Sequence, residues 1–175
     1  MPPSPARKQS GERTTGRSFT ARGVGRTAVL IWHTEVSLEG ARAIADVFAD
    51  LRVKHLSEGL GFLTVLERDT DIRPSPAARQ AVAQVLTDYG SSIGAAAIAY
   101  EADGFKATIV RSVITAINLA SSTRFPNRVF AGTDEAIDWI AETLQDEKLN
   151  LQLRAGVAAL RKSHPGVSGQ RLRTP

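Results

Sequence analysis

The stretch from residue 61 to residue 89 constrains the fold more than any other part of the chain. Residues 62–66 read Phe-Leu-Thr-Val-Leu, an apolar and partly β-branched run of strand length. After a polar loop, Ser75 stands where a helix N-cap belongs, and Pro76 occupies the first helical position. The apolar residues that follow recur at helical spacing: Ala78, Ala81, Val82, Val85, Leu86 and Tyr89. We therefore predict a central strand–loop–helix unit whose strand is covered on both faces of its sheet.

The other apolar patterns place this unit within one α/β domain over residues 17–146. We predict strands at 17–22, 27–34, 93–100 and 127–131, and helices at 38–54, at 104–120 and after Thr133, which we expect to cap the last one. A short Gly-containing turn separates the first two strands, so they are expected to form an antiparallel hairpin. The element order is then ββαβαβαβα. It implies a mixed, mostly parallel, five-stranded sheet flanked by helices.

Basic charge is concentrated at the two ends of the chain. Residues 1–26 carry six basic groups against one acid, and residues 151–175 carry five basic groups and no acid. The stretch between them has 11 basic and 17 acidic groups, so the formal net charge of +4 belongs to the ends. We predict that residues 1–16 form a disordered basic tail, and that 147–175 form a basic extension, partly helical and then disordered. This distribution argues against a nucleic-acid-binding domain, which would carry basic charge on a folded face.

Several classes of protein are excluded or disfavoured. The chain has no cysteine, which rules out disulfides and thiolate metal sites. No apolar run approaches the roughly 20 residues of a transmembrane helix, and the N-terminus lacks the apolar middle of a secretory signal. Neither a phosphate-binding Gly-x-x-x-x-Gly-Lys-Ser/Thr motif nor a Gly-x-Ser-x-Gly elbow is present. We therefore expect a cytoplasmic protein that is not an enzyme and that uses no cofactor.

The titratable residues suggest two weaker alternatives. His33 ends a predicted strand beside Glu35, so the two could act as a base and its orienter, although we expect a structural histidine there. Glu67, Asp69 and Asp71 follow the carboxyl end of the central strand, where open α/β sheets place ligands. Such acids could hold Mg²⁺ through oxygen ligands, or one could accept a phosphoryl group, but a solvated loop is the simpler interpretation and we predict no metal site.

The topology resembles that of the STAS domain, the family of the anti-sigma-factor antagonists and the SpoIIAA-like proteins. A local pattern strengthens the resemblance, because residues 124–140 are similar to the SpoIIAA-like join between the last strand and the last helix. The residues that match this pattern are Phe130, Glu135, Ala136, Trp139 and Ile140. In the antagonist branch a serine in an Asp-Ser-Ser-Gly segment is phosphorylated by a partner kinase. This chain reads Ile-Arg-Pro-Ser-Pro over residues 72–76 instead.

The resemblance implies a regulatory protein that acts by binding a protein partner. We expect the partner to dock on the loop and helix start that follow the central strand: Asp69, Thr70, Asp71, Arg73, Ser75 and Arg79. Ser75 is the one position at which we would expect phosphorylation, because the first turn of a helix accepts a phosphate. The alternative is that the protein binds a small apolar or lipid-like ligand between the helix at 104–120 and the sheet, as in the SpoIIAA-like group.

Overall fold

The computed structural model of the chain describes residues 14–102 and 125–164. Its sheet has six strands in the order β1-β2-β3-β4-β5-β6. The strands are β1 Thr14–Thr15, β2 Phe19–Val24, β3 Thr27–Trp32, β4 Leu60–Leu66, β5 Ile93–Tyr100 and β6 Asn127–Phe130. The first three pair antiparallel, and β3 to β6 run parallel. The predicted α/β class and the mostly parallel mixed sheet are therefore confirmed, with the two-residue β1 added at the edge.

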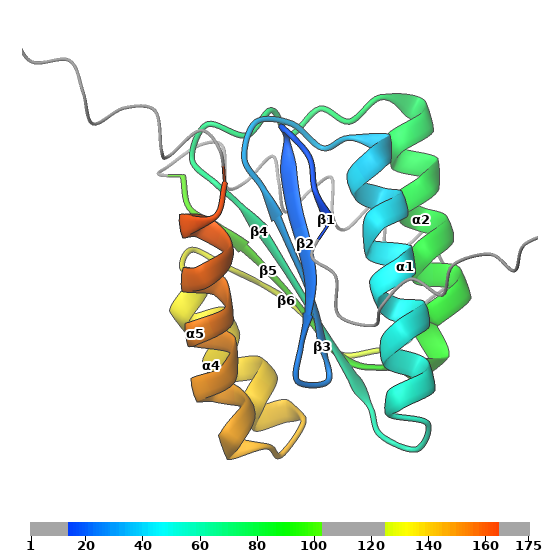
Figure 1. Cartoon of the computed structure of the whole chain (residues 1–175), viewed down its shortest axis with the longest axis vertical. Coiled ribbons are helices and arrows are strands. Elements are labelled where there is room, and N and C mark those ends of the chain that lie inside the picture. The colour runs from blue at the N-terminus through cyan, green and yellow to red at the C-terminus, as the bar shows by residue number, and fades with distance from the viewer. Residues whose placement is uncertain (1–13, 103–124, 165–175) are drawn as a thin grey trace, which may run out of the picture.

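Helices cover both faces of this sheet. They are α1 Leu38–Lys54, α2 Pro76–Tyr89, α4 Thr133–Thr143 and α5 Glu147–Lys162. Figure 1 shows α1 and α2 on one side of the sheet and α4 and α5 on the other. The helix predicted at 104–120 and most of the disordered tail predicted at 1–16 lie outside the described residues. Two residues of that tail, Thr14 and Thr15, form β1 instead, because their backbone pairs with β2. No helix within the described ranges has both the length and the apolar character that a membrane crossing needs.

The local signals for α1, α2 and the hairpin act as predicted. The Ser37 side chain accepts a hydrogen bond from the amide of Gly40, and that of Ser75 accepts one from the amide of Ala78 at 3.2 Å. Strands β2 and β3 form a regular antiparallel pair from Phe19↔Trp32 to Val24↔Thr27. Helix caps and a short turn therefore determine where α1 and α2 begin and how β2 pairs with β3.

Helix α5 belongs to the folded core, which extends beyond the boundary that we predicted at residue 146. Its apolar stripe is buried against the sheet and α4: Leu149, Leu153, Val157 and Leu160. At Gly156 an added Cβ would lie 2.7 Å from Val24 Cγ2, so the glycine permits the close approach of α5 to β2. The Asp146 side chain caps the helix by accepting from the amide of Leu149 at 3.1 Å. The extension is thus integral to the domain as far as the structure describes it.

The start of α4 differs from our expectation. Thr133 is the first helical residue rather than the cap, and the N-cap is Gly132, which makes no side-chain hydrogen bond. The Thr133 hydroxyl instead donates to Glu101 Oε1 at 2.6 Å, at the end of β5. The residue that we took for a cap therefore ties α4 to the neighbouring strand.

Candidate functional site

An apolar pocket lies between the sheet and the α1/α2 layer. Its floor is formed by β3, β4 and β5, and its wall by α2, with contributions from α1, from residues 72–74 and from residues 125–127. All but three of its described lining residues are apolar, among them Trp32, Phe62, Leu66, Val82, Leu86 and Ile98. The cavity has a volume of about 120 Å³. By comparison, an engineered apolar cavity of about 150 Å³ stays dry and binds benzene.

The burial of the strand residues shows that the pocket reaches the middle of the sheet. Thr64 is the one residue of β4 that is not fully buried, and its partner in the register of β5, Ile98, is also only partly buried. On α2, the stripe that we predicted as core is buried at Val85 and Leu86, whereas Val82 is only partly buried. These five residues all line the pocket. The hollow is therefore a real gap between two apolar surfaces that a packed core would bring together.

Three polar side chains interrupt the apolar lining: Thr64 on the floor, Arg79 in the first turns of α2, and Asn127 at the start of β6. Arg79 is the only charged residue among the described lining residues, and its side chain is solvent-exposed. No hydrogen bond or ion pair engages the Arg79 guanidinium within the described part of the chain. A few polar groups in an apolar cavity are the usual composition of a small-molecule site.

The predicted docking residues follow β4 but do not form one exposed surface. Asp69, Asp71, Arg73 and Ser75 are exposed, whereas Thr70 is 5% exposed. The Thr70 hydroxyl donates to the carbonyl of Trp32 at 2.8 Å, so it fastens the loop to β3 and cannot serve a partner.

Asp71 is held from two sides. Its backbone forms a parallel bridge with Glu35, and its carboxylate accepts from the Arg73 amide at 3.0 Å and from Arg73 Nε at 3.1 Å. These bonds from Arg73 keep the pKa of Asp71 below its usual value. The same loop contributes Ile72 and Pro74 to the pocket, so the exposed charges and the apolar lining alternate along it.

The residues of the family-like pattern are packing residues. The Phe130 and Trp139 rings lie 5.8 Å apart between centroids, and Arg128 lies over Phe130. Ala136 and Ile140 are buried against β5, and only Glu135 is exposed. The pattern therefore joins β6 to α4, on the face of the sheet opposite the pocket.

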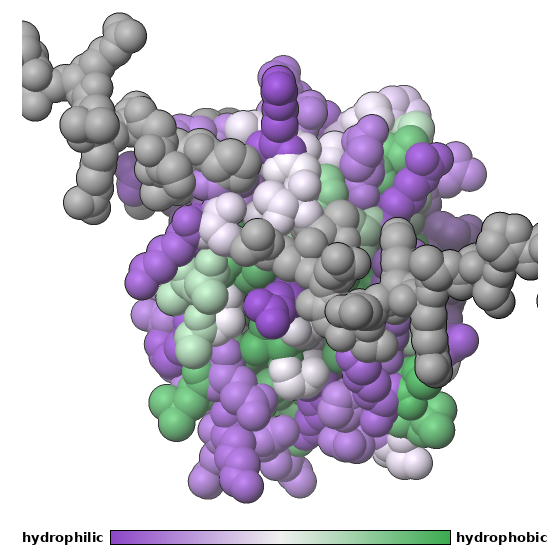
Figure 2. Space-filling model, viewed as in Figure 1, coloured by the Kyte–Doolittle hydropathy of each residue, from purple (hydrophilic) through white to green (hydrophobic). Residues whose placement is uncertain are grey.

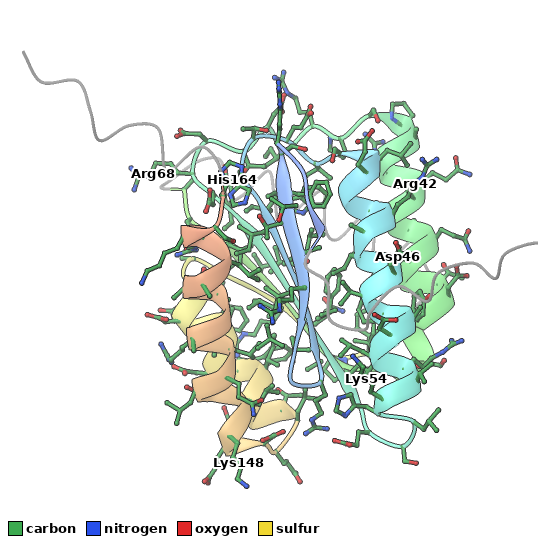
Figure 3. All side chains as sticks on the ribbon, in the orientation of Figure 1. Arg42, Asp46, Lys54, Arg68, Lys148 and His164 are labelled. Atoms are coloured by element: carbon green, nitrogen blue, oxygen red, sulfur yellow. The ribbon has the colours of Figure 1, made fainter. Side chains whose placement is uncertain are left out.

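A polar network occupies the carboxyl edge of the parallel strands on the α4/α5 side. His33, directly after β3, is buried and lies 2.9 Å from Glu67 Oε2 through Nδ1 and 2.9 Å from Thr20 Oγ1 through Nε2. The His164 ring stacks on it with centroids 3.7 Å apart, and its Nε2 donates to the carbonyl of Arg17. Figure 3 labels His164 at the end of α5, away from α1. His33 is thus buried and bonded at both ring nitrogens, and its carboxylate partner is Glu67 rather than Glu35.

Arg161 extends this network across two strand ends. It donates to Glu101 Oε1 at 2.5 Å and lies 3.8 Å from Glu67 Oε1. The pKa of Glu67 is lowered, chiefly by the hydrogen bond from His33 and further by the positive charge of Arg161. His33, Glu67 and Arg161 are each bonded to another member of the network, and Thr20 is fully buried. The arrangement fastens α5 to the sheet, and the hydroxyl bonded to His33 is the buried one of Thr20.

A second, polar groove of about 490 Å³ adjoins this network at the start of α4. Its basic residues are Arg154 and Arg161, and both are paired: Arg154 with Asp134 and Asp138, and Arg161 with Glu101. Among residues 14–102 and 125–164, no three acidic or histidine side chains lie where they could share a metal ion. Glu67, Asp69 and Asp71 do not converge, since the carboxylates of Glu67 and Asp71 bond to different neighbours.

Comparisons with protein-family models, with curated proteins and with solved structures return no match for this chain. The candidate site therefore rests on its own geometry.

Sequence reasoning missed two of these features, although a signal existed for each. Thr64 stands alone as a polar residue in an otherwise apolar central strand, and it proves to lie on the pocket floor. His33 and Glu67 each follow directly after neighbouring parallel strands whose last residues, Trp32 and Leu66, are paired in register. Two residues that each come one position after paired strand ends lie side by side, and this relation could have linked His33 to Glu67.

Proposed function

We propose that the protein binds a small apolar ligand in the pocket between α2 and the sheet, and that it acts by binding rather than by catalysis. One observation carries this proposal: a cavity of about 120 Å³ with a nearly wholly apolar lining reaches the central strand β4. Filling it with an apolar group removes apolar surface from water at about 25 cal/mol per Å². It also restores the van der Waals contacts that the hollow lacks.

A binding assay with a blocked pocket tests the proposal. Val82→Phe places a ring into the cavity from α2, and Val53→Phe adds the same ring at a position on α1 that is 74% exposed. We expect a fluorescent apolar dye to bind the wild type and Val53→Phe equally, and Val82→Phe at least about ten-fold more weakly. Native mass spectrometry of the purified protein then reports any ligand that copurifies. Equal dye binding by all three proteins would contradict the proposal.

We propose as a second function that a protein partner docks on the loop after β4, as expected of a cytoplasmic regulator of STAS or SpoIIAA-like type. The support is the exposure of Asp69, Arg73 and Ser75 on a loop that also lines the pocket, so a ligand and a partner would contact one segment. The element order and the pattern at Phe130 to Ile140 support the proposed kinship.

Charge reversal tests this second function. Asp69→Lys combined with Arg73→Glu reverses the charges of the loop without changing the net charge. Arg42→Glu combined with Asp46→Lys does the same on α1, where Figure 3 labels both residues. We expect the loop variant alone to lose partners recovered by affinity capture and mass spectrometry. Recovery of the same partners by both variants would remove the loop from the interface.

A further inference from the structure

We infer that the ligand of the pocket is a monocarboxylate, with an apolar body of ring or short-chain size in the cavity and its anionic group at Arg79. This inference rests on the proposed function and specifies its ligand class. The feature that carries it is the single positive charge among the described lining residues, the rest of which are uncharged and mostly apolar.

Arg79 is held in position but its charge is not neutralised. Its backbone amide donates to the carbonyl of Ser75 at 2.9 Å, which fixes the residue near the start of α2. Within the described residues its guanidinium has no acidic partner, whereas Arg73 is paired with Asp71 and Arg154 with Asp134. A guanidinium binds a carboxylate through two parallel hydrogen bonds, and the positive end of the α2 dipole adds to the attraction.

The floor of the pocket accepts a neutral body only. Thr64 contributes one hydroxyl there, and no acidic or basic side chain of the described chain joins it. A charge on the floor would be removed from water without a counter-charge, which is costly. The anionic group must therefore stay at the rim, beside the exposed Arg79.

The lining also discriminates among charged head groups. A cationic ligand would want a carboxylate, and none lines the pocket among the described residues. A phosphate monoester carries close to two negative charges at neutral pH and would want more than one cation. The cavity volume of about 120 Å³ suits a ring or a short alkyl chain. These limits together select a small carboxylate.

The native fluorescence of Trp32 provides a direct readout, because this residue lines the pocket. The chain has two tryptophans, and the other, Trp139, packs on Phe130 at the opposite face. In a Trp139→Phe background, Trp32 is the only tryptophan. Four probes of equal chain length are titrated: octanoate, octanol, octylamine and octyl phosphate.

We expect octanoate to bind about ten-fold more tightly than octanol, and both to bind more tightly than octylamine. Arg79→Gln should abolish the preference for octanoate while leaving octanol binding unchanged, which also shows that the variant is folded. Arg42→Gln, the same change at an exposed position of α1 outside the pocket lining, should keep the preference.

The remaining outcomes overturn the inference. If octanol or octylamine equals octanoate, or if Arg79→Gln keeps the preference, the ligand is not selected by its charge, and the proposed apolar site still stands. If octyl phosphate binds best, the ligand class is a phosphate monoester. If none of the four probes changes the Trp32 signal or binds by calorimetry, both the inference and the proposed function fail.

Discussion

The two faces of the sheet are built from the same strands but are closed to different degrees. On the α4/α5 face, alternate residues of β3 and β4 such as Val29 and Leu63 pack against α4 and α5, and no member of this core is more than 4% exposed. On the α1/α2 face the core contains larger rings, including Trp32 and Phe62, yet Thr64 and Ile98 stay partly exposed. Larger side chains have thus not produced the tighter face.

The difference teaches how the domain separates stability from binding. The small Ala97 and Ala99 of β5 let α4 approach closely, so that Ile137 and Ile140 fill the space between them. The α1/α2 face forgoes part of this packing and keeps a hollow instead. A hollow loses the contacts that its lining would make, so it is tolerated where the opposite face supplies the stability.

The surface agrees with this division of roles. On the side seen in Figure 2, hydrophilic side chains prevail over the outer helices, and hydrophobic surface is confined to small separate patches. Large exposed apolar side chains in the described ranges are Val53, Leu56 and Leu151. They lie singly or in pairs near helix ends, which is ordinary for a globular protein.

The largest expected effect tests the closed face. Leu153→Ala removes a fully buried side chain of α5 and should lower the free energy of unfolding by about 2–5 kcal/mol, because the packed surroundings leave a cavity. Leu151→Ala, two residues earlier and 74% exposed, should change it by less than about 0.5 kcal/mol. Urea denaturation measures both. Equal values for the two variants would mean that α5 is not docked.

The next largest effect on stability comes from the same change, threonine to valine, made once on each face of the sheet. Thr20→Val deletes the hydroxyl bonded to His33 Nε2 and should cost about 1–3 kcal/mol, since a buried ring nitrogen loses its partner. Thr64→Val exchanges a hydroxyl for a methyl group on the pocket floor, where no hydrogen bond to another described residue is lost, and should be neutral within about 0.5 kcal/mol. If Thr64→Val lost more stability than Thr20→Val, the α1/α2 face would be the more tightly bonded of the two, contrary to this comparison.

The sequence predicted best where local chemistry decides the structure. Ser37 and Ser75 cap the helices as expected because their side chains bond amides only three residues away. Thr133 was misjudged because its hydroxyl has a better acceptor in Glu101, which is 32 residues distant and brought near only by the folded sheet. Local patterns contain no information about such a competitor.

The same limit explains the candidate site. Arg79 and Thr64 were separated by 15 positions and belonged to different elements, so no motif linked them, and the pocket emerged only from the way that α2 lies over β4. Conversely, the solvated loop expected after β4 is exposed at Asp69 and Asp71, whereas Glu67 is partly buried against His33 and Thr70 is buried. Its alternation of polar residues with Ile72 and Pro74 contained the signal that one side of it faces an apolar space.

The cap of α2 provides a smaller test on the pocket face. Ser75→Ala removes the acceptor for the Ala78 amide and should cost about 1 kcal/mol, whereas Ser75→Asp keeps an acceptor and should melt like the wild type. If Ser75 is also a regulatory phosphorylation site, Ser75→Asp should lose a docked partner without losing stability. Partner binding by Ser75→Asp at wild-type strength would leave Ser75 with its structural role alone.

The smallest expected effect is a pH dependence on the α4/α5 face. The His33 hydrogen bond lowers the pKa of Glu67 in the folded state below its ordinary value of 4.5. A carboxyl with a lowered folded pKa contributes stability that is complete above the unfolded pKa and is lost as the pH falls through the folded one. Because the side chain is 31% exposed, solvent screening should limit the contribution to a fraction of a kcal/mol.

Glu67→Gln isolates the pH-dependent contribution of the Glu67 carboxylate to stability, because the amide can still accept from His33 but does not titrate. The difference in unfolding free energy between the wild type and Glu67→Gln should shrink as the pH falls below the ordinary value of 4.5 and through the lowered folded pKa of Glu67. Glu142→Gln, at an exposed position with no ion pair among the described residues, serves as the matched control. The difference in unfolding free energy between the wild type and Glu142→Gln should change less over the same range of pH. Urea denaturation measures both differences. A difference for Glu67→Gln that stays flat as the pH falls below 4.5 would mean that the carboxylate is not tied to His33, and that the end of α5 is held by packing and by the Arg161–Glu101 pair without help from Glu67.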